Sequence, residues 1–323
     1  MLPPLPAIRG LKSMSRVRDV FSKGKAFIPF ITAGDPDLAT TEELVPAMAE
    51  AGADLIELGI PFSDPIAEGI VIQEADMRAL ASGVTTDKLF DCVKRIRKKT
   101  DVPLAFMTYI NPVFVYGSER FLKNAAESGI DALIVPDMPF EEREELLPFC
   151  RKYGIEPLVT ITHFDCPIHL IREYGGWKSY RLVEFYKRLV TTLFTRFKGL
   201  VHYWLTFNEI NMILHLPFMG AGLVFEEGED PKKAQYTSVH HELIASAWAV
   251  KLAHEIDPEN KVGCMMAAGD YYPYCCMPED VWEAKKQDRA NLMFIDVQAR
   301  GYYPNYAKKL FEQMELTLPL SLE

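Results

Sequence analysis

Short apolar segments alternate with amphipathic helical patterns along nearly the whole of this chain. Seven of these segments are expected to form strands, at residues 26–34, 54–60, 103–110, 131–137, 156–164, 201–208 and 261–269. A helical pattern follows each of them, and single helices between strands are typical of a parallel sheet with right-handed crossovers. The strand segments are apolar throughout, as expected for strands that are buried on both faces. The alternation therefore predicts an α/β fold.

Eight such strand–helix units would close a (β/α)8 barrel of the TIM type, and 323 residues are enough for one. For the eighth strand the chain offers LMFIDVQ (292–298), whose pattern is the weakest of the eight. An open doubly wound sheet is the alternative, but no GxGxxG motif follows the first strand. We therefore predict a single barrel whose closure depends on residues 292–298.

The regions between the expected strands differ in how clearly they predict helices. Clear helical patterns occupy residues 40–52, 85–100, 117–129, 140–154, 180–199, 240–257, 278–291 and 304–314. The stretch 215–238 is long and irregular, and loops of that size are usually functional or disordered. His240 and His241 would then begin the next helix as a surface pair. Residues 1–13 and 313–323 are expected to be an irregular leader and tail.

Charge and cysteine content narrow the possible functions. The formal net charge is −10, which argues against binding to nucleic acid or to anionic membranes. The six cysteines include no CxxC pair, and this usage is typical of reduced thiols in a cytoplasmic protein. No spacing of His, Asp or Glu indicates a metal site, no motif calls for a cofactor, and no apolar run approaches a membrane span.

Several polar side chains of the first half fall at the carboxyl ends of expected strands, where a barrel builds its active site. If Leu58 faces the helices, Glu57 points into the barrel, where burial would raise its pKa and suit it to acid or base catalysis. A strand-end salt bridge is the alternative role for Glu57. The remaining candidates are Asp64 and Glu68 in the next loop, Tyr109 and Asn111 after the third strand, and Asp137 after the fourth.

The first half contains the motifs PFITAGDPD, LIELGIPFSDPIAEGIVIQ, PLAFMTYINPV, YGSERF and ALIVPDMPFEE. On these motifs, residues 14–154 resemble the α subunit of tryptophan synthase. The resemblance implies cleavage of indole-glycerol phosphate, with Glu57 as general acid or base and Glu68 in the place of the second catalytic carboxylate. Tyr109 and Asp137 would line the substrate pocket. The rim at Asp64 and Asn111 would meet a β subunit that carries pyridoxal phosphate.

This half also departs from the family pattern. Glu68 stands where the family has Asp, and Gly69-Ile70 replaces Gly-Pro; catalytic geometry tolerates little displacement. The family binds the substrate phosphate with glycine-rich loops after late strands. The candidates AAGDYYPYCCMP and DVQARGYYP lack the expected glycine pattern. We therefore expect the phosphate site to be missing.

The second half places Glu209 at the carboxyl end of a strand, beside Asn208, where a buried acid can protonate a leaving oxygen. A rim carboxylate in a hydrogen-bond network is the alternative. Residues 155–312 resemble family 1 glycoside hydrolases of the 6-phospho-β-glucosidase type, on the motifs EPLVTITHFDCPIHLIREYGGW, YWLTFNEIN, KVGCMMA and DVQARGYYPNY. The resemblance implies Glu209 as general acid/base and Asn208 as a ligand of the sugar 2-hydroxyl. It also places His163 and Trp177 at or near the sugar pocket.

The glycosidase-like half lacks a nucleophile. A retaining enzyme needs a second carboxylate about 5–5.5 Å from the acid. The family takes it from a Thr-Glu-Asn-Gly motif that this chain does not contain. Glu57 of the first half is a conceivable substitute, because strands two and six would face each other across an eight-stranded barrel.

The two resemblances meet at Gly154-Ile155, after a helix and before a strand, so the βα order continues across the join. This composite leaves three functions open. It could be an indole-glycerol-phosphate lyase, a β-glucosidase or 6-phospho-β-glucosidase, or a non-catalytic scaffold with two incomplete sites. With essential parts lacking on both sides, we expect little or no turnover.

Overall fold

The computed structural model describes residues 16–21, 24–65, 68–138, 140–267 and 269–318, which fall into two compact units, Met1–Leu158 and Val159–Glu323. Neighbouring strands follow the order of the chain from β1 to β7, and every strand pair with an established register is parallel. The predicted α/β fold is therefore confirmed. Strand β5 contributes residues to both units.

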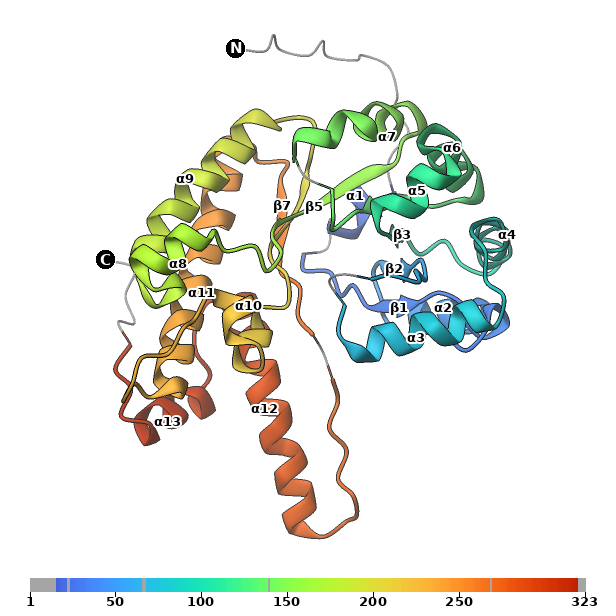
Figure 1. Ribbon diagram of the computed structural model, residues 1–323. Helices are drawn as coiled ribbons and strands as arrows, with labels where there is room; N and C mark the ends of the chain where they lie inside the picture. Colours follow the sequence, from blue (N-terminus) through green and yellow to red (C-terminus); the bar gives the residue numbers. More distant parts are fainter. Residues whose placement is uncertain (1–15, 22–23, 66–67, 139, 268, 319–323) are drawn as a thin grey trace. The chain divides into compact units, whose positions relative to one another are not determined.

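The first unit alternates strands with single helices or helix pairs (Figure 1). Its elements are α1 (Arg16–Val20), β1 (Phe30–Thr32), α2 (Leu38–Glu50), β2 (Ile56–Gly59), α3 (Ile70–Ala81), α4 (Thr86–Ile96), β3 (Leu104–Met107), α5 (Ile110–Tyr116), α6 (Ser118–Ser128), β4 (Ala132–Ile134), the 3-10 helix η2 (Phe140–Glu145), α7 (Leu147–Tyr153) and the start of β5 (Glu156–Thr162). Local signals set the helix starts, since Asp37 caps α2 and Thr85 caps α4.

The two faces of these strands differ in chemistry. Along one row of the sheet, Phe30 pairs with Glu57, Glu57 with Ala105, and Ala105 with Ala132. These four residues point to the same face, because strand side chains alternate. The residues between them, such as Leu58, belong to the hydrophobic core on the opposite face. Glu57 therefore points away from the helix-covered face, as the alternation predicted.

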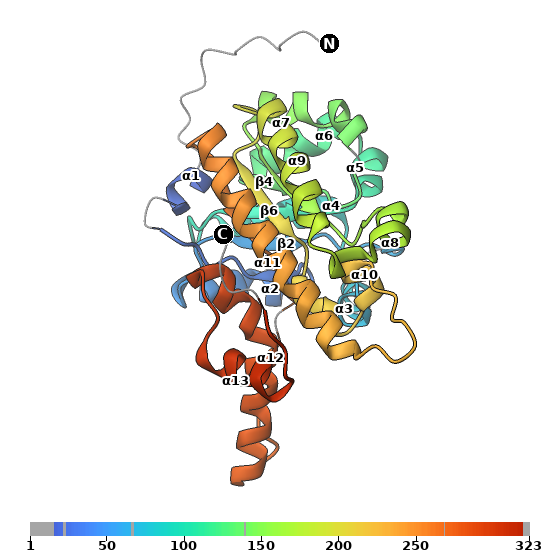
Figure 2. The same ribbon diagram turned by 90° about the vertical axis from the view of Figure 1, so that its left-hand side faces the viewer.

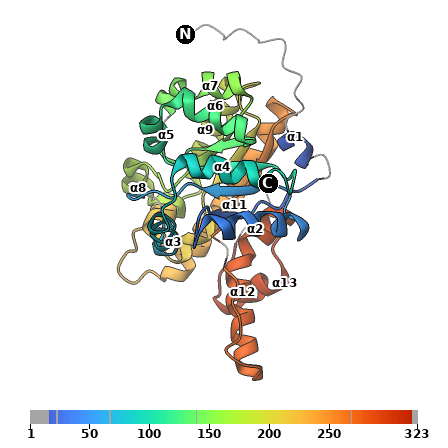
Figure 3. The same cartoon turned by 90° about the vertical axis from the view of Figure 1, so that its right-hand side faces the viewer.

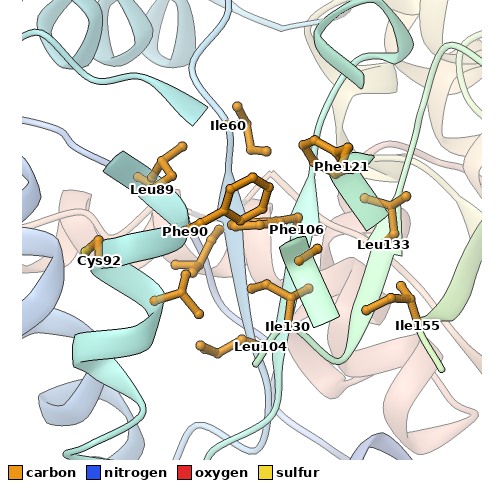
Figure 4. Packing of buried hydrophobic residues seen from close by; sticks show 14 of the residues in the cluster. Ile60, Leu89, Phe90, Cys92, Leu104, Phe106, Phe121, Ile130, Leu133 and Ile155 are labelled. Carbon is orange, nitrogen blue, oxygen red and sulfur yellow. The ribbon is translucent and has the colours of Figure 1, made fainter. Parts of the chain in front are cut away.

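The core of the first unit lies between the strands and their covering helices. Phe106 from β3, Phe90 from α4 and Phe121 from α6 pack edge to face or tilted, with ring centroids 5.5–6.2 Å apart (Figure 4). Helix α4 lies between α2 and α6 (Figure 3). Beside this core, Arg97 and Asp131 form a nearly buried ion pair at 2.7 Å. This packing fixes β2 and β3, and with them the position of Glu57.

The second unit is dominated by two long helices that pack along each other, α9 and α11 (Figure 2). Its elements are the end of β5, α8 (Ile168–Tyr174), η3 (Gly176–Lys178), α9 (Arg181–Arg196), β6 (Tyr203–Phe207), η4 (Ile210–Leu214), α10 (Pro217–Ala221), α11 (Pro231–Ile256), β7 (Lys261–Gly263), α12 (Pro278–Arg300) and α13 (Asn305–Gln313).

Two expectations for this unit were wrong. Residues 292–298 are not a strand but the last turns of α12, with Met293 and Phe294 buried, so the described residues contain no eighth strand. The stretch 215–238 is not irregular throughout, because it holds α10 and the first turns of α11. Asp230 caps α11 through the backbone N–H groups of Lys232 and Lys233, which starts the helix well before residue 240.

Candidate active sites

Glu57 is the most strongly perturbed carboxyl group of the first unit's inner strand face. Its side chain is 5% exposed, and burial raises its pKa from 4.5 to about 7. Its neighbours in the row, Phe30 and Ala105, are apolar, so they do not offset the cost of burying a charge. A carboxyl group with a pKa near 7 can both accept and donate a proton at neutral pH.

Tyr109 and Glu68 are brought together at the carboxyl ends of β2 and β3. The Tyr109 hydroxyl donates a hydrogen bond to Oε2 of Glu68. The ring of Tyr109 is buried and lies 5.4 Å from the ring of Phe62. Glu68 therefore does not extend freely into solvent but is held by a residue that follows the neighbouring strand.

Asp137 also lies at this edge, after β4. Its Oδ1 accepts a hydrogen bond from the Ile110 backbone N–H at 2.8 Å, which ties the end of β4 to the start of α5. Burial raises the pKa of Asp137, and the Ile110 N–H partly opposes that effect. Asp64 and Asn111 are exposed at the rim, where Ser63 Oγ donates to Asp64 at 2.5 Å.

Asp76 is a buried carboxylate that the sequence analysis did not identify. It lies on α3 and is 6% exposed. Burial raises its pKa to about 6, and the charges of Glu68 and Asp35 add to that effect. An aspartate between Ala75 and Met77 carries no motif, although its spacing from the buried Ala75 and Ala79 indicates the packed face of α3.

The second unit holds Asn208 and Glu209 immediately after β6. Asn208 is buried, and its backbone N–H donates to the Thr162 carbonyl at 2.9 Å, which joins the ends of β5 and β6. Glu209 has φ 43° and ψ 53°, in the left-handed region that side chains other than glycine rarely occupy. A non-glycine residue in this conformation costs about 1–2 kcal/mol, and such strain clusters at functional sites.

His163 and Phe164 follow β5 in a similar way. Phe164 also has a left-handed backbone, with φ 60°. Strands β5 and β6 are therefore each followed, two residues after their last residue, by a strained residue, Phe164 and Glu209. Burial lowers the pKa of His163, which favours a neutral imidazole at pH 7. Its Nδ1 is buried and has no hydrogen-bond partner among the residues that the structure describes. An orphaned ring nitrogen beside a strained turn suits a polar ligand.

Other residues singled out in the second half belong to its core. Trp177 is 5% exposed and packs against Tyr186 and Phe207 at 5.9 and 5.4 Å between ring centroids. The expectation of a surface pair at His240 and His241 was wrong, because both are buried inside α11. Their Nδ1 atoms pair with the Tyr303 hydroxyl at 2.9 Å and with the Trp177 carbonyl at 2.8 Å.

The two candidate phosphate loops lie at the ends of α12. DVQARGYYP begins inside α12, and AAGDYYPYCCMP leads into the start of that helix. A cavity of about 460 Å³ does lie between residues 271–273 and α12, lined mainly by Tyr271, Pro273, Val281 and Trp282. None of the predicted site residues lines this cavity.

Within the described ranges, no three His, Cys, Asp or Glu side chains are grouped so as to hold a metal ion. Across those same ranges, no helix is both long enough and apolar enough to cross a membrane.

Family models match the two halves of the chain separately. The model for the tryptophan synthase alpha chain matches residues 18–173, and that for glycosyl hydrolase family 1 matches residues 142–322. The expected join at Gly154-Ile155 lies inside the overlap of the two matches. Both resemblances are therefore confirmed, and they occupy the halves expected of a chimera.

Similar proteins fall into the same two groups. The 6-phospho-beta-glucosidase AscB of Escherichia coli (strain K12) is 60% identical over 169 residues, which are 52% of this chain and 36% of that protein. The tryptophan synthase alpha chain of Lacticaseibacillus casei is 53% identical over 151 residues, which are 46% of this chain and 57% of that protein. The chain thus spans only part of each relative.

Among solved structures, tryptophan synthase subunit alpha from Legionella pneumophila str. Paris is 25% identical. It covers 73% of this chain and 100% of its own, with a TM-score of 0.48.

Proposed function

The chain belongs to glycosyl hydrolase family 1 through residues 142–322 and matches the tryptophan synthase alpha chain through residues 18–173, and from this composite make-up we propose a weak lyase. Its first half would cleave indole-glycerol phosphate to indole and glyceraldehyde 3-phosphate. The observation that carries the proposal is Glu57, a buried carboxyl group on the inner strand face with a pKa of about 7. Its substrate would be a small molecule, and its compartment the cytoplasm.

The chemistry requires one proton to change place. As the carbon–carbon bond breaks, the hydroxyl next to the indole ring loses a proton to become the aldehyde, and indole C3 gains one. Glu57 is suited to carry that proton, because near pH 7 its two protonation states are about equally populated. Glu68, held by Tyr109, would act on the indole ring N–H, and Asp137 would line the pocket.

Turnover is expected to be low because binding energy is missing. A phosphate group held by backbone N–H donors orients a substrate for reaction, and orientation accounts for much of a catalytic rate. The candidate loops in the second half lack the glycine pattern with which the resembled family would supply such donors. The extra methylene of Glu68, relative to the aspartate of the resembled family, would also displace its carboxylate.

Indole release from indole-glycerol phosphate tests the lyase proposal. We expect the unaltered chain to release indole measurably faster than a Glu57→Gln variant, and as fast as a Glu74→Gln variant, since Glu74 is an exposed carboxylate on α3. If release by the unaltered chain does not exceed that of Glu57→Gln, the lyase proposal is wrong. A cooperative unfolding transition without turnover would then favour the non-catalytic scaffold.

A glycosidase activity is the second candidate, and the strained backbone of Glu209 beside the buried Asn208 favours it. Glu209 would protonate the leaving oxygen, with Asn208 and His163 binding the sugar. A retaining reaction would also need a second carboxylate as nucleophile. Hydrolysis of an activated aryl β-glucoside, with and without a 6-phosphate, should be faster than in Glu209→Gln. Equal rates would exclude this role.

A β-subunit contact completes the proposal for the first half. Asp64 and Asn111 are exposed at the rim, and α5 presents Phe114 and Val115, which are 41% and 82% exposed. Exposed apolar side chains next to polar rim residues are typical of protein interfaces. A purified tryptophan synthase β subunit should retain the chain in a pull-down, and a Val115→Lys variant should be retained less. No retention of the unaltered chain would refute the contact.

A further inference from the structure

Exposed apolar side chains are concentrated in the first half of α12 and in the loop before it. Tyr272, Tyr274 and Trp282 are 83%, 98% and 56% exposed, and Met277 and Val281 are about half exposed. Figures 1 and 2 show this part of α12 extending beyond α13 and the other helices of the second unit. We call residues 271–288 the α12 arm. Apolar side chains that gather on one surface in this way are typical of a protein interface.

The loop of the α12 arm is held against the helix at two points. The backbone N–H of Tyr271 donates to Oδ1 of Asp288 at 3.1 Å, and that of Cys275 donates to Oδ2 of Asp280 at 3.1 Å. Between the loop and the helix lies the cavity of about 460 Å³, whose walls include Trp282. The arm is therefore ordered before any partner binds, and binding does not have to order it.

The charges of the α12 arm are complementary to themselves. Glu283 forms an ion pair with Lys286, whereas the exposed Glu279 and Lys285 have no ion-pair partner among the residues that the structure describes. Glu279, Trp282 and Lys285 are spaced three residues apart, so they follow one side of the helix. If a two-fold axis at Trp282 relates two antiparallel α12 helices, Glu279 of each copy lies opposite Lys285 of the other. This is the self-complementarity that a two-fold interface requires.

The exposed area of the α12 arm is large enough for such a pair. Tyr271, Tyr272, Tyr274 and Trp282 are between 44% and 98% exposed. At about 200 Å² for an aromatic side chain, these four offer about 500 Å² per copy and about 1,000 Å² for two copies. The aliphatic side chains of the arm add to this area. A specific interface needs about 1,000 Å² or more, so two arms reach the size of a small specific interface.

We propose that the α12 arm is a dimerisation surface, on which a second copy of this chain docks with its own α12 antiparallel about a two-fold axis at Trp282. The two tryptophan side chains meet at the axis, and a Glu279–Lys285 pair flanks them on each side. The assembly closes at two copies because each arm covers the other. An interface this small is expected to dissociate at concentrations on the order of micromolar. The inference does not depend on the proposed lyase function.

Sedimentation velocity of the full chain at increasing concentration tests the dimer. A reducing agent is needed, because Cys275 and Cys276 are exposed on the arm and can cross-link two copies. We expect a monomer–dimer equilibrium that Trp282→Ala weakens by about tenfold or more, since buried aromatic side chains dominate interfaces. Phe218→Ala, at an exposed aromatic residue of α10, should leave it unchanged. A chain that stays monomeric, or a dimer that Trp282→Ala does not weaken, would overturn the proposal.

Charge reversal tests the antiparallel arrangement. Glu279→Lys places two lysines opposite each other twice, and Lys285→Glu does the same with two glutamates, so each should weaken the dimer about three- to tenfold. The double variant restores opposite charges and should recover most of the loss. Lys309→Glu, at an exposed lysine of α13, is the control and should have no effect.

Hydrogen exchange then locates the interface. Peptides covering residues 271–288 should become protected as the concentration of the chain rises, and those covering α13 should not. The substituted side chains are exposed, so the thermal unfolding of each variant should match that of the unaltered chain. The proposed arrangement is wrong if the double variant associates no better than the single variants. It is equally wrong if a dimer forms without protection of the α12 arm, because the interface would then lie elsewhere.

Discussion

Removing the charge of Glu57 should change how the stability of the first unit depends on pH. In the unfolded chain this carboxyl group titrates near 4.5, and in the folded chain near 7. Between these values the folded state holds a proton that the unfolded state has lost, so the unfolding free energy falls as the pH rises. At about 1.36 kcal/mol per pH unit, the difference between the folded and unfolded pKa values corresponds to about 3 kcal/mol of unfolding free energy. This contribution is fully lost above pH 7.

Glu57→Gln has no carboxyl group to ionise and should lack this dependence. We therefore expect the unfolding free energy of the variant, relative to that of the unaltered chain, to rise by about 3 kcal/mol between pH 4.5 and pH 8. All four tryptophans lie beyond residue 176, so their fluorescence reports on the second unit. Urea unfolding should instead be followed by hydrogen-exchange mass spectrometry of peptides from β2 and β3.

The matched control is Glu74→Gln. Its unfolding free energy should differ from that of the unaltered chain by the same amount at every pH in this range. Comparing variants at each pH cancels the contributions of other groups, including Asp76. A Glu57→Gln difference in unfolding free energy that stays constant from pH 4.5 to pH 8 would refute this expectation, because the folded and unfolded chains would then titrate alike at this position.

Two further substitutions test the backbone strain and the buried ion pair. Glu209→Gly should raise the unfolding free energy by about 1 kcal/mol in tryptophan-monitored urea unfolding, because glycine accepts the left-handed conformation; Glu209→Ala should bring no such gain. Asp131→Asn should cost about 3 kcal/mol in thermal unfolding, because it leaves Arg97 buried without a charged partner. Asp101→Asn, at a carboxylate that is 98% exposed, should change stability by less than about 0.5 kcal/mol.

The sequence predicted the strands and the facing of Glu57 well, because both depend on local periodicity. Leu58 and Phe106 belong to the helix-side core, and Glu57 lies on the other face. The same local reasoning misassigned 292–298, since a short apolar run fits a buried helix turn as well as a strand. Here the helix that begins at Pro278 continues through it.

The remaining errors concern residues whose setting comes from distant parts of the chain. His240 and His241 were placed at a helix start because the capping residue Asp230 lay inside a stretch interpreted as irregular. Asp76 was missed because its burial on α3 comes from tertiary packing, which no local motif indicates.

Composition, periodicity and motif order were enough to establish an α/β chain made of two family-like halves, with carboxylates at the ends of its strands. They were enough because side-chain alternation and helix capping act over a few residues. The protonation of those carboxylates was decided by tertiary packing. Glu57 acquires a pKa of about 7 because β1 and β3 exclude water from both sides. Desolvation is a property of neighbours that the chain brings together only when it folds.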